Sequence, residues 1–290
     1  MELNQLAALP QPDGRRVALR VSPAGERSVR DGHPWLFDGS IVRTSHDGAP
    51  GDLGVVFDRK GRFMAVGLYD PDSPIRLRIL QQGTPTDIDP VFWDQRIARA
   101  IARRAPLAAT ATSASVTDGY RLLHGENDGL PGLVVDRYAD TLVMKLYTAA
   151  WIPHLAAVIP ALLAHQPAAR IVLRLSRAVA AQPDQLAGLT DGCALLGELP
   201  HGPVIFQENG LRFEAEPVRG QKTGFFLDQR ENRGRVEKLA HGKTVLNVFA
   251  YNGGFSLYAA RGGATTVASL DISKAALVAA ARNFGLNQDV

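Results

Sequence analysis

The sequence contains a single cysteine, Cys193, among its 290 residues. One cysteine excludes an internal disulfide, and such scarcity favours a reducing compartment, so we expect a cytoplasmic protein. The sequence also lacks an apolar run of about 18 residues, which argues against a membrane-spanning helix, and we expect no membrane partner. The first residues lack the basic start and apolar core of a secretory signal, and we expect residues 1–14 to form a flexible tail.

The composition is that of an ordinary globular chain. Apolar residues make up 46% and charged residues 21% of the sequence, which has room for two or three domains. The net charge of +3 is compatible with nucleic-acid binding but does not require it. Arginine outnumbers lysine, which suits bidentate phosphate contacts, although a GC-rich genome produces the same bias.

Residues 15–82 are rich in short β-type runs. Turn residues separate these runs, at positions 23–25, 47–48 and 60–61 among others, and long helical patterns are lacking. Evenly spaced short strands of this kind predict a small β-barrel.

One segment of this region mixes basic side chains with an aromatic ring. Arg27, Arg30 and His33 precede Trp35 closely, and such a group can hold phosphate and stack on a base. These four residues are therefore candidate RNA-binding residues. Alternatively, Trp35 belongs to the core and the arginines form a solvated rim.

Residues 83–202 alternate helical and strand patterns, which predicts a small α+β domain. Helices are expected over residues 87–107 and 151–165. The same region contains four predicted strands and an Ala/Ser/Thr-rich linker: 120–123, 132–136, 141–147 and 170–175 for the strands, and 108–117 for the linker.

The third region, residues 203–290, begins with a predicted hairpin. The Asn209-Gly210 pair lies between two apolar runs and is typical of a two-residue hairpin loop. A helix is expected over residues 230–241, where the interleaved charges favour a solvated face. Ser273 is a suitable N-cap for a second helix over residues 274–284.

The pattern between these two helices organises the region. An apolar run over residues 244–249 predicts a buried parallel strand, and the glycine pair Gly253-Gly254 follows it before a helical pattern begins. A second apolar run over residues 265–270 ends in Asp271. Strand, glycine turn, helix, strand and acid is the order in which a Rossmann-like half holds an adenosine cofactor.

Each part of this pattern has a physical reason. Glycines let the backbone approach a ligand, and Asp271 can accept hydrogen bonds from both ribose hydroxyls. The motif is not GxGxxG, which disfavours a pyrophosphate, and Tyr251 and Phe255 beside the turn suit a flat base. S-adenosylmethionine (SAM) fits this description. Alternatively, Gly253 and Gly254 form only a tight turn, and Asp271 is only an acid at a helix N-terminus.

Long motifs in the sequence resemble a known family. QKTGFFLDQRENR, VLNVFAYNGGFSLYAA, LDIS and HGENDGLPGLVVDRYAD are similar to motifs of SAM-dependent large-subunit ribosomal RNA methyltransferases that carry an N-terminal PUA domain. The best-known member makes 5-methylcytosine in 23S ribosomal RNA. The resemblance runs from about Arg15 to the last residue. Asn247 stands where the family has an acid, so we expect a weakened contact there.

The resemblance implies a fold of α/β plus β class. It predicts a PUA-like RNA-binding barrel over residues 15–82, a middle α+β domain over 83–202 and the N-terminal part of a Rossmann-like methyltransferase domain over 203–290. It also implies SAM as cofactor, ribosomal RNA as partner and pairing into a homodimer. The implied cofactor-binding residues are Gln221, Thr223, Gly224, Phe225, Asn247, Phe249, Tyr251, Gly253, Gly254, Phe255, Asp271, Ile272 and Ser273.

The resemblance also sets an expectation for the chemistry. The family adds a cysteine thiolate to the pyrimidine ring before methyl transfer, and Cys193 precedes the cofactor motifs instead of following them. We therefore expect Cys193 to be a small buried hydrophobic residue, and the nucleophile and acceptor site to lie beyond Val290. A chain with only this part of the sheet is expected to be inactive and to expose apolar faces.

A polar cluster invites a metal or acid–base interpretation. His124, Glu126, Asn127 and Asp128 lie close together, but the flanking glycines indicate a turn, and no further ligand cluster appears. We expect no metal here, and instead a hydrogen-bonded turn against the catalytic domain.

Two other functions remain open from the residues alone. The first is a non-catalytic RNA-binding module, formed by the barrel and the middle domain. The second is an oxidoreductase with a nicotinamide cofactor, which the missing GxGxxG motif disfavours.

Overall fold

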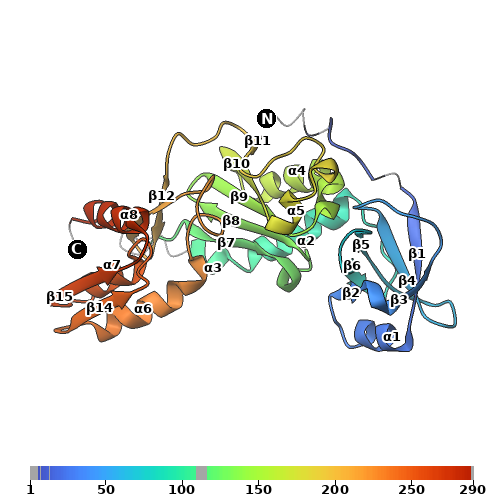
Figure 1. Ribbon diagram of the computed structural model, residues 1–290, viewed down its shortest axis with the longest axis horizontal. Helices are drawn as coiled ribbons and strands as arrows, with labels where there is room; N and C mark the ends of the chain where they lie inside the picture. The colour runs from blue at the N-terminus through green and yellow to red at the C-terminus, as the bar shows by residue number, and fades with distance from the viewer. Residues whose placement is uncertain (1–5, 7, 13, 109–115, 289–290) are drawn as a thin grey trace. The chain divides into compact units, whose positions relative to one another are not determined.

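The computed structural model describes residues 6, 8–12, 14–108 and 116–288 (Figure 1). Most of the predicted linker at 108–117 lies outside the described residues, whereas Leu6 and Leu9 of the expected tail are buried. Within the described part of the chain, no helix has the length and apolar character needed to cross a lipid bilayer. The chain forms two compact units, the first made of Met1–Ala105, Leu122–Asp136 and Asp140–Leu199, and the second of Pro106–Arg121, Arg137–Ala139 and Pro200–Val290.

The first unit begins with a six-stranded sheet, in agreement with the predicted β-rich region. Its strand order is β2-β6-β5-β4-β1-β3, and β1 pairs with β4 in parallel whereas the other described pairings are antiparallel. Val17, Leu19, Leu36 and Leu77 are buried in its core. The strands are β1 (Arg16–Val21), β2 (Trp35–Phe37), β3 (Ile41–Thr44), β4 (Leu53–Phe57), β5 (Phe63–Tyr69) and β6 (Ile75–Gln82).

The turn predicted at residues 23–25 is wrong, because these residues begin helix α1 (Pro23–Arg30). Ser22 caps this helix by accepting a hydrogen bond from the Gly25 backbone N–H at 3.2 Å. Proline is well suited to the first helical position, where its missing N–H has no intrahelical partner to lose. As a result, Arg27 and Arg30 lie on a helix instead of a loop. A short 3₁₀ turn (Asp38–Ser40) joins β2 to β3.

A five-stranded sheet follows, with strand order β11-β10-β9-β8-β7. The predicted strands are confirmed within one or two residues at each end, and the hairpin expected at residues 139–140 joins β8 to β9, with Ala139 at φ 52°. The strands are β7 (Gly119–His124), β8 (Leu133–Tyr138), β9 (Thr141–Leu146), β10 (Arg170–Leu175) and β11 (Ala194–Leu196).

Helices accompany this sheet as predicted, with altered bounds. Helix α2 (Pro90–Ala102) packs against α4 (Leu155–His165). Residues 149–154 form a 3₁₀ helix, so the first four residues of the helix predicted at 151–165 are 3₁₀ and not α-helical. Pro153 lies inside this 3₁₀ segment, and α4 contains a second proline, Pro160. The remaining short helices of this part are α3 (Ala105–Ala108), α5 (Arg177–Ala180) and the 3₁₀ turns Gly125–Asp128 and Pro183–Gln185.

Buried polar contacts join the two sheets of the first unit. The Thr148 hydroxyl donates to the Asp70 carboxylate, and His154 Nε2 lies 2.8 Å from the Gly51 carbonyl oxygen. Because a buried polar group without a partner is costly, these contacts favour one relative position of the two sheets.

The second unit contains the predicted hairpin, formed by β12 (Val204–Glu208) and β13 (Leu211–Ala215). Asn209 and Gly210 both have positive φ, as a tight hairpin turn requires. A 3₁₀ turn (Leu227–Gln229) leads into the helices and the last two strands. These are α6 (Arg230–Leu239), β14 (Thr244–Val248), α7 (Gly254–Arg261), β15 (Thr266–Leu270) and α8 (Lys274–Gly285).

Strands β14 and β15 pair in parallel, as predicted, but they are not buried as the apolar run at 244–249 suggested. Alternate residues point to opposite faces, and only the face toward α7 is covered. On the other face, Leu246 is 65% and Leu270 57% exposed.

Candidate functional site

The turn between β14 and α7 has an uncommon backbone. Phe249 and Tyr251 adopt positive φ values of 61° and 48°, and Gly253 has φ 78°. A Cβ atom on Gly253 would lie 2.9 Å from the Cβ of Ala280, so this position requires glycine. Non-glycine residues rarely occupy the left-handed region, and such conformations concentrate at ligand-binding sites.

Asp271 lies at the same end of the sheet as this turn. Its Oδ2 accepts a hydrogen bond from the Tyr251 backbone N–H at 2.8 Å, and its Oδ1 accepts one from Ser273 at 2.8 Å. The hydrogen bonds from Ser273 and Tyr251 hold the pKa of the Asp271 carboxyl below its ordinary value. The glycine turn and the acid, 20 residues apart in the sequence, are therefore adjacent, and the carboxylate is ionised at neutral pH.

Asn247 faces the helix-covered side of β14. Its Nδ2 donates to Ser256 Oγ at 2.9 Å, and Ser256 Oγ lies 2.7 Å from Ser269 Oγ. The Asn247 amide thus connects β14 to α7, and through Ser256 to β15, below the turn. The amide therefore has a hydrogen-bond partner at position 247, where the family has an acid.

The predicted segment at residues 221–225 divides into two kinds of residue. Thr223 and Phe225 are buried: the Thr223 hydroxyl lies 3.1 Å from the Tyr138 hydroxyl, and Phe225 packs 5.0 Å from the Phe206 ring. Gln221 and Gly224 instead line a cavity. The buried residues, Gly224 among them, anchor the segment, and Gln221 is exposed.

This cavity has a volume of about 370 Å³ and lies between the 216–224 segment, the glycine turn and α8. Four predicted residues line it: Gln221, Gly224, Tyr251 and Ser273. The remaining lining residues include charged groups that the sequence did not single out, namely Glu214, Glu216, Arg219 and Arg282, together with Pro203, Gly220, Asn252, Ala275, Ala276 and Ala279.

The other predicted residues lie around the turn without lining the cavity. Phe249 and Ile272, which follow the two strands, are 88% and 103% exposed. Gly254 begins α7, and a Cβ there would lie 3.1 Å from Arg233 Cδ. Phe255 is half-buried in the first turn of the helix. Two exposed apolar side chains at adjacent strand ends form a surface suited to a flat ligand.

A buried ion pair supports this turn, and the sequence did not predict it. Arg233 was expected on a solvated helix face, but it is 2% exposed and makes two 2.7 Å hydrogen bonds to the Glu208 carboxylate. Arg233 also donates to the Phe226 carbonyl at 3.1 Å. Burial, and then the Glu208 charge, raise the pKa of the Tyr258 hydroxyl, which donates to Glu208. The pair joins the hairpin, α6 and α7.

The four candidate RNA-binding residues lie on α1 and the segment that follows it. Arg27, Arg30 and His33 are exposed, and Trp35 is half-buried. The Trp35 indole N–H donates to Glu126 Oε1 at 2.8 Å, so this ring is held by the 3₁₀ turn Gly125–Asp128 of the same unit. Trp35 is thus not part of the buried core that the alternative interpretation assigned to it, and Arg27 and Arg30 are exposed.

The His124–Asp128 cluster is a turn, as expected. Asp128 accepts hydrogen bonds from the His124 backbone and from Arg104, and the contact of Glu126 is Trp35. These partners belong to the first unit, with Arg104 just after the end of α2, and not to the catalytic domain as expected. Among the described residues, no group of three or more potential ligands could hold a metal. Cys193 is half-buried and not fully buried as expected.

Comparison with known proteins decides the family. Residues 19–82 match the PUA-like domain, and residues 133–290, more than half of the chain, match the S-adenosylmethionine-dependent methyltransferase family. The chain belongs to this methyltransferase family. Its fold is therefore a PUA-like domain followed by a SAM methyltransferase fold, and SAM is the family's cofactor.

The relatives of this methyltransferase are longer than the chain. A protein of Deinococcus radiodurans named ribosomal RNA large subunit methyltransferase is 56% identical over 97% of the chain and 69% of its own length. A protein of Shewanella frigidimarina named ribosomal RNA large subunit methyltransferase I is 36% identical over 93% of the chain and 67% of its own length.

Solved structures agree on the fold. A Streptococcus mutans protein described as a SAM-dependent methyltransferase superposes with a TM-score of 0.77 at 20% identity, over 93% of this chain and 67% of its own. A methyltransferase complexed with S-adenosylhomocysteine (SAH) gives 0.78 at 20% identity over the same shares. At this identity the likeness concerns the fold alone.

Several residues of this methyltransferase fit its cofactor. Gly253 lets the turn pack against Ala280 of α8, and the ionised Asp271 lies against this turn. Phe249 and Ile272 present apolar surface beside them. A hydrogen-bond acceptor and an apolar surface beside it are two features that a nucleoside site needs.

Proposed function

We propose that this protein transfers a methyl group from SAM to large-subunit ribosomal RNA, and that the target is carbon 5 of a cytosine. The observation that carries the cofactor part is the contact between the Tyr251 backbone N–H and Asp271 Oδ2 at 2.8 Å, which holds the glycine turn beside the acid. The names of the relatives support the ribosomal RNA substrate. The resemblance of the motifs supports the cytosine target.

The proposed roles follow from where the side chains lie. Asp271 accepts hydrogen bonds from the ribose through the lone pairs that remain beside its two backbone contacts. Phe249 and Ile272 pack against the adenine, because both are exposed at the strand ends. Gly253 and Gly254 let the backbone approach the cofactor and begin α7, whose first N–H groups face acceptor atoms.

The segment at residues 221–225 closes the opposite side. Gln221 and Gly224 contact the cofactor from the cavity wall, whereas Thr223 and Phe225 hold the segment to the core. Tyr251 and Ser273 line the same cavity, and the half-buried Phe255 packs behind the turn. Asn247 positions the turn from below through Ser256.

When bound, SAM supplies a methyl group on a positively charged sulfur; the acceptor carbon attacks this methyl group, and SAH is the leaving group. The residues of this chain bind and orient. The exposed apolar surface of Phe249 and Ile272 excludes water from one side of the site, and the Arg233–Glu208 pair keeps the turn in place. Fixed orientation of reacting groups is a large part of the catalysis that a methyltransferase provides.

Calorimetry with SAH tests the cofactor site. Replacing Asp271→Ala removes the ribose acceptor, and we expect about tenfold or greater loss of affinity, since a hydrogen bond to a charged group contributes about 1.5–3 kcal/mol. Asp271→Asn keeps the size of the side chain and one carbonyl acceptor, so its SAH affinity is expected to lie between those of the unaltered chain and Asp271→Ala. Glu231→Ala is the matched control, because Glu231 is exposed and contacts the adjacent Arg230. Unchanged SAH affinity in Asp271→Ala contradicts the ribose assignment.

Incubation with methyl-labelled SAM and unmodified large-subunit ribosomal RNA tests transfer. Label in 5-methylcytidine after nuclease digestion supports the proposal and refutes the expectation of an inactive chain. Label in another nucleoside contradicts the cytosine target. SAH binding without label in RNA agrees with the expected inactivity and restricts the proposal for these residues to cofactor binding.

A further inference from the structure

A small cleft lies beside the carboxyl-terminal half of α2, within the first unit. It is formed by α2, the 3₁₀ turn Gly125–Asp128 and the glycine after this turn, and its volume is about 140 Å³. This volume lies below the range of about 300–1,000 Å³ that small-molecule sites occupy, so the cleft has room for one small group and not for a nucleoside. We call it the α2 cleft, and its lining residues are Arg96, Arg99, Ala100, Arg103, Asn127, Asp128 and Gly129.

Arg96 is held in this cleft by neutral partners. Its Nη1 donates to the carbonyl oxygens of Leu80 and Gly129, both at 3.0 Å, and its Nη2 donates to Gln81 Oε1 at 3.2 Å. Its guanidinium carbon lies 4.6 Å from the centroid of the Phe92 ring. Carbonyl and amide oxygens fix the orientation of a guanidinium but do not cancel its charge, so Arg96 presents a positive charge in a fixed position.

The glycine after the turn makes room for this arginine. Gly129 has φ 70°, and a Cβ atom there would overlap Arg96 Nη1. Any other residue would therefore displace the guanidinium as well as strain the backbone. Glycine at this position thus preserves the placement of Arg96 in the cleft.

Positive charge exceeds negative charge in the α2 cleft. Among the described residues that line it, Asp128 has the only carboxylate, and Arg104, which does not line the cleft, contacts that carboxylate at 2.7 Å. Arg103 also contacts Asp128, at 3.2 Å, but its side chain is 56% exposed. Burial, and then the charge of Arg99, lower the pKa of Arg96, so these two guanidinium groups repel each other. The cleft therefore carries positive charge that its own carboxylate does not balance.

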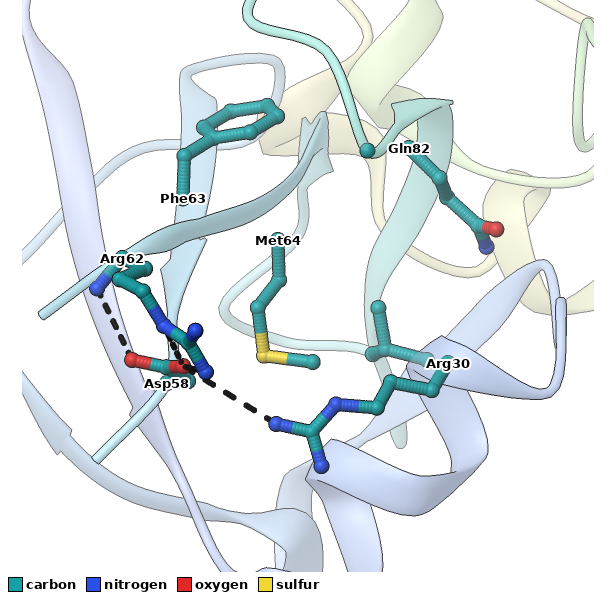
Figure 2. Close-up of a pocket in the computed structure, with 8 residues that line it drawn as sticks. Arg30, Asp58, Arg62, Phe63, Met64 and Gln82 are labelled. Carbon is teal, nitrogen blue, oxygen red and sulfur yellow. Dashed lines mark hydrogen bonds and ion pairs between the residues drawn. The ribbon is translucent and has the colours of Figure 1, made fainter. Parts of the chain in front are cut away.

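The arginines of a cavity in the PUA-like domain are balanced differently. Figure 2 shows Arg62 and Arg30 beside Asp58, and their distances to its carboxylate are 2.8 Å and 4.0 Å. In the described part of the chain, the hydrogen-bond partners of Arg96 are all neutral. A carboxylate cancels part of the attraction of a guanidinium for a further anion, whereas Arg96 keeps that attraction.

The dipole of α2 accounts for only part of this cluster. The helix ends at Ala102, and Arg99 lies in its last turn, where a positive charge is stabilising. Arg96 lies more than one turn earlier, and the effect of the dipole falls off within the last turn. A charge held in place at position 96 therefore needs a separate reason.

We propose that the α2 cleft binds one phosphate group. Arg96 and Arg99 donate hydrogen bonds to its oxygens, and Arg103 adds a third positive charge. Guanidinium groups match phosphate oxygens in charge and in the geometry of their donors, and a cleft without room for a base reads no sequence. The phosphate belongs either to the backbone of the RNA or to a free anion, and the first source rests on the proposed function, because RNA is the proposed substrate.

Titration with inorganic phosphate tests the cleft itself. The Nε–H resonances of arginine in the full chain are followed by NMR, at an ionic strength held constant with sodium chloride, and Arg99→Ala assigns one resonance by its loss. We expect the resonance of Arg99 to shift and to saturate, because its guanidinium is exposed and meets the anion directly. The resonance of Arg16 is the matched control, since Arg16 is exposed, pairs with Asp87 and does not line the cleft.

Binding of single-stranded large-subunit RNA fragments shows whether the phosphate belongs to RNA. Arg99→Ala is expected to weaken binding about tenfold on every sequence, and to reduce the slope of log K against log salt by about 0.7, the value for one phosphate on a single strand. Arg99→Lys should bind with an affinity between those of the unaltered chain and Arg99→Ala, because it keeps the charge and loses the fork. Arg16→Ala removes an equal charge outside the cleft and is expected to have a smaller effect.

The outcomes separate the two sources of phosphate. A weaker RNA complex of Arg99→Ala with the reduced salt slope supports the cleft with an RNA phosphate as ligand. A saturable shift at Arg99, with equal RNA affinities of Arg99→Ala and Arg16→Ala, supports it with a free phosphate as ligand. Without such a shift, equal RNA affinities of the two variants overturn the proposal, and so does weaker binding with an unchanged salt slope. If the unaltered chain binds no RNA, the proposed RNA substrate fails, and the phosphate titration alone decides the cleft.

Discussion

Two parallel strand pairs of similar sequence differ sharply in their surroundings. In the first unit, β9 and β10 are almost entirely buried, and Leu146 is 0% exposed. In the second, β14 and β15 alternate between half-buried and exposed residues, and Leu246 is 65% exposed. An apolar strand is therefore buried only where elements cover both of its faces, and the covering elements come from elsewhere in the chain.

The polar interiors of the two units differ as well. The first unit joins its sheets through the neutral His154 and a threonine–aspartate contact, whereas the second contains the Arg233–Glu208 ion pair. The three tryptophans, Trp35, Trp93 and Trp151, all belong to the first unit. Tryptophan fluorescence therefore reports the first unit, and far-UV circular dichroism reports both, so the comparison can be tested one unit at a time.

The largest effect is expected from Glu208→Ala. Removing one partner leaves Arg233 buried and unpaired, which costs about 3–5 kcal/mol. In urea, the unfolding transition followed by circular dichroism should move to a lower urea concentration, and the transition followed by tryptophan fluorescence should move less. Arg282→Ala, which breaks the exposed pair with Glu214, is the control and should cost about 1 kcal/mol or less. Equal shifts of both probes would show that the two units unfold together.

Matched leucines test the contrast between the strand pairs directly. Leu146→Ala in β9 should reduce the free energy of unfolding by about 2–5 kcal/mol, because it leaves a cavity in a closed core. Leu246→Ala in β14 should change it by less than about 0.5 kcal/mol, because the side chain is already exposed. A similar cost at both positions would mean that Leu246 is covered in solution.

Acid should weaken the first unit through His154. Burial lowers the pKa of His154, and its Nε2–H donates to the Gly51 carbonyl, so the folded state holds it neutral. Below the ordinary histidine pKa of about 6.5, the unfolded chain binds a proton that the folded chain does not. Stability is therefore lost as the pH falls from 7.5 to 5.5, by about 1.4 kcal/mol at most. His154→Gln should remove this part of the pH dependence of the tryptophan transition; an unchanged dependence contradicts the assignment.

The smallest effects should have opposite signs at two glycines of the second unit. Gly234 lies inside α6 with open space around its Cβ position, so Gly234→Ala should stabilise the unit by about 0.5–1 kcal/mol. Gly253 has φ 78° and would place a Cβ against Ala280, so Gly253→Ala should cost about 1 kcal/mol or more. Thermal melting by circular dichroism measures both. A stabilising Gly253→Ala would show that the turn relaxes without strain.

Local patterns predicted most of the elements. The Asn209-Gly210 hairpin, the parallel pair β14–β15 and the Ser273 cap were all confirmed, because each depends on a few neighbouring residues. The helix at Pro23–Arg30 was missed, because a proline suits both a turn and a first helical position, and only the Ser22 cap separates the two.

The candidate cofactor site was predicted in part. Its turn and its acid follow from strand and glycine spacing, which the sequence contains. The cavity wall formed by Glu216, Arg219 and Arg282 was missed, because these residues come from a loop and a helix that carry no motif. Arg233 was misjudged for a related reason, since a charged helix predicts solvent unless a distant carboxylate such as Glu208 meets it.

The sequence by itself determined the order of elements, the family and the residues of the glycine turn, because these follow from short-range periodicity and from long motifs. Tertiary structure alone decided which apolar strands are buried, where Arg233 finds its partner and that the turn at residues 127–129 meets the arginines of α2. Burial and charge pairing depend on groups far apart in the chain, and their free energies exist only once folding has brought those groups together.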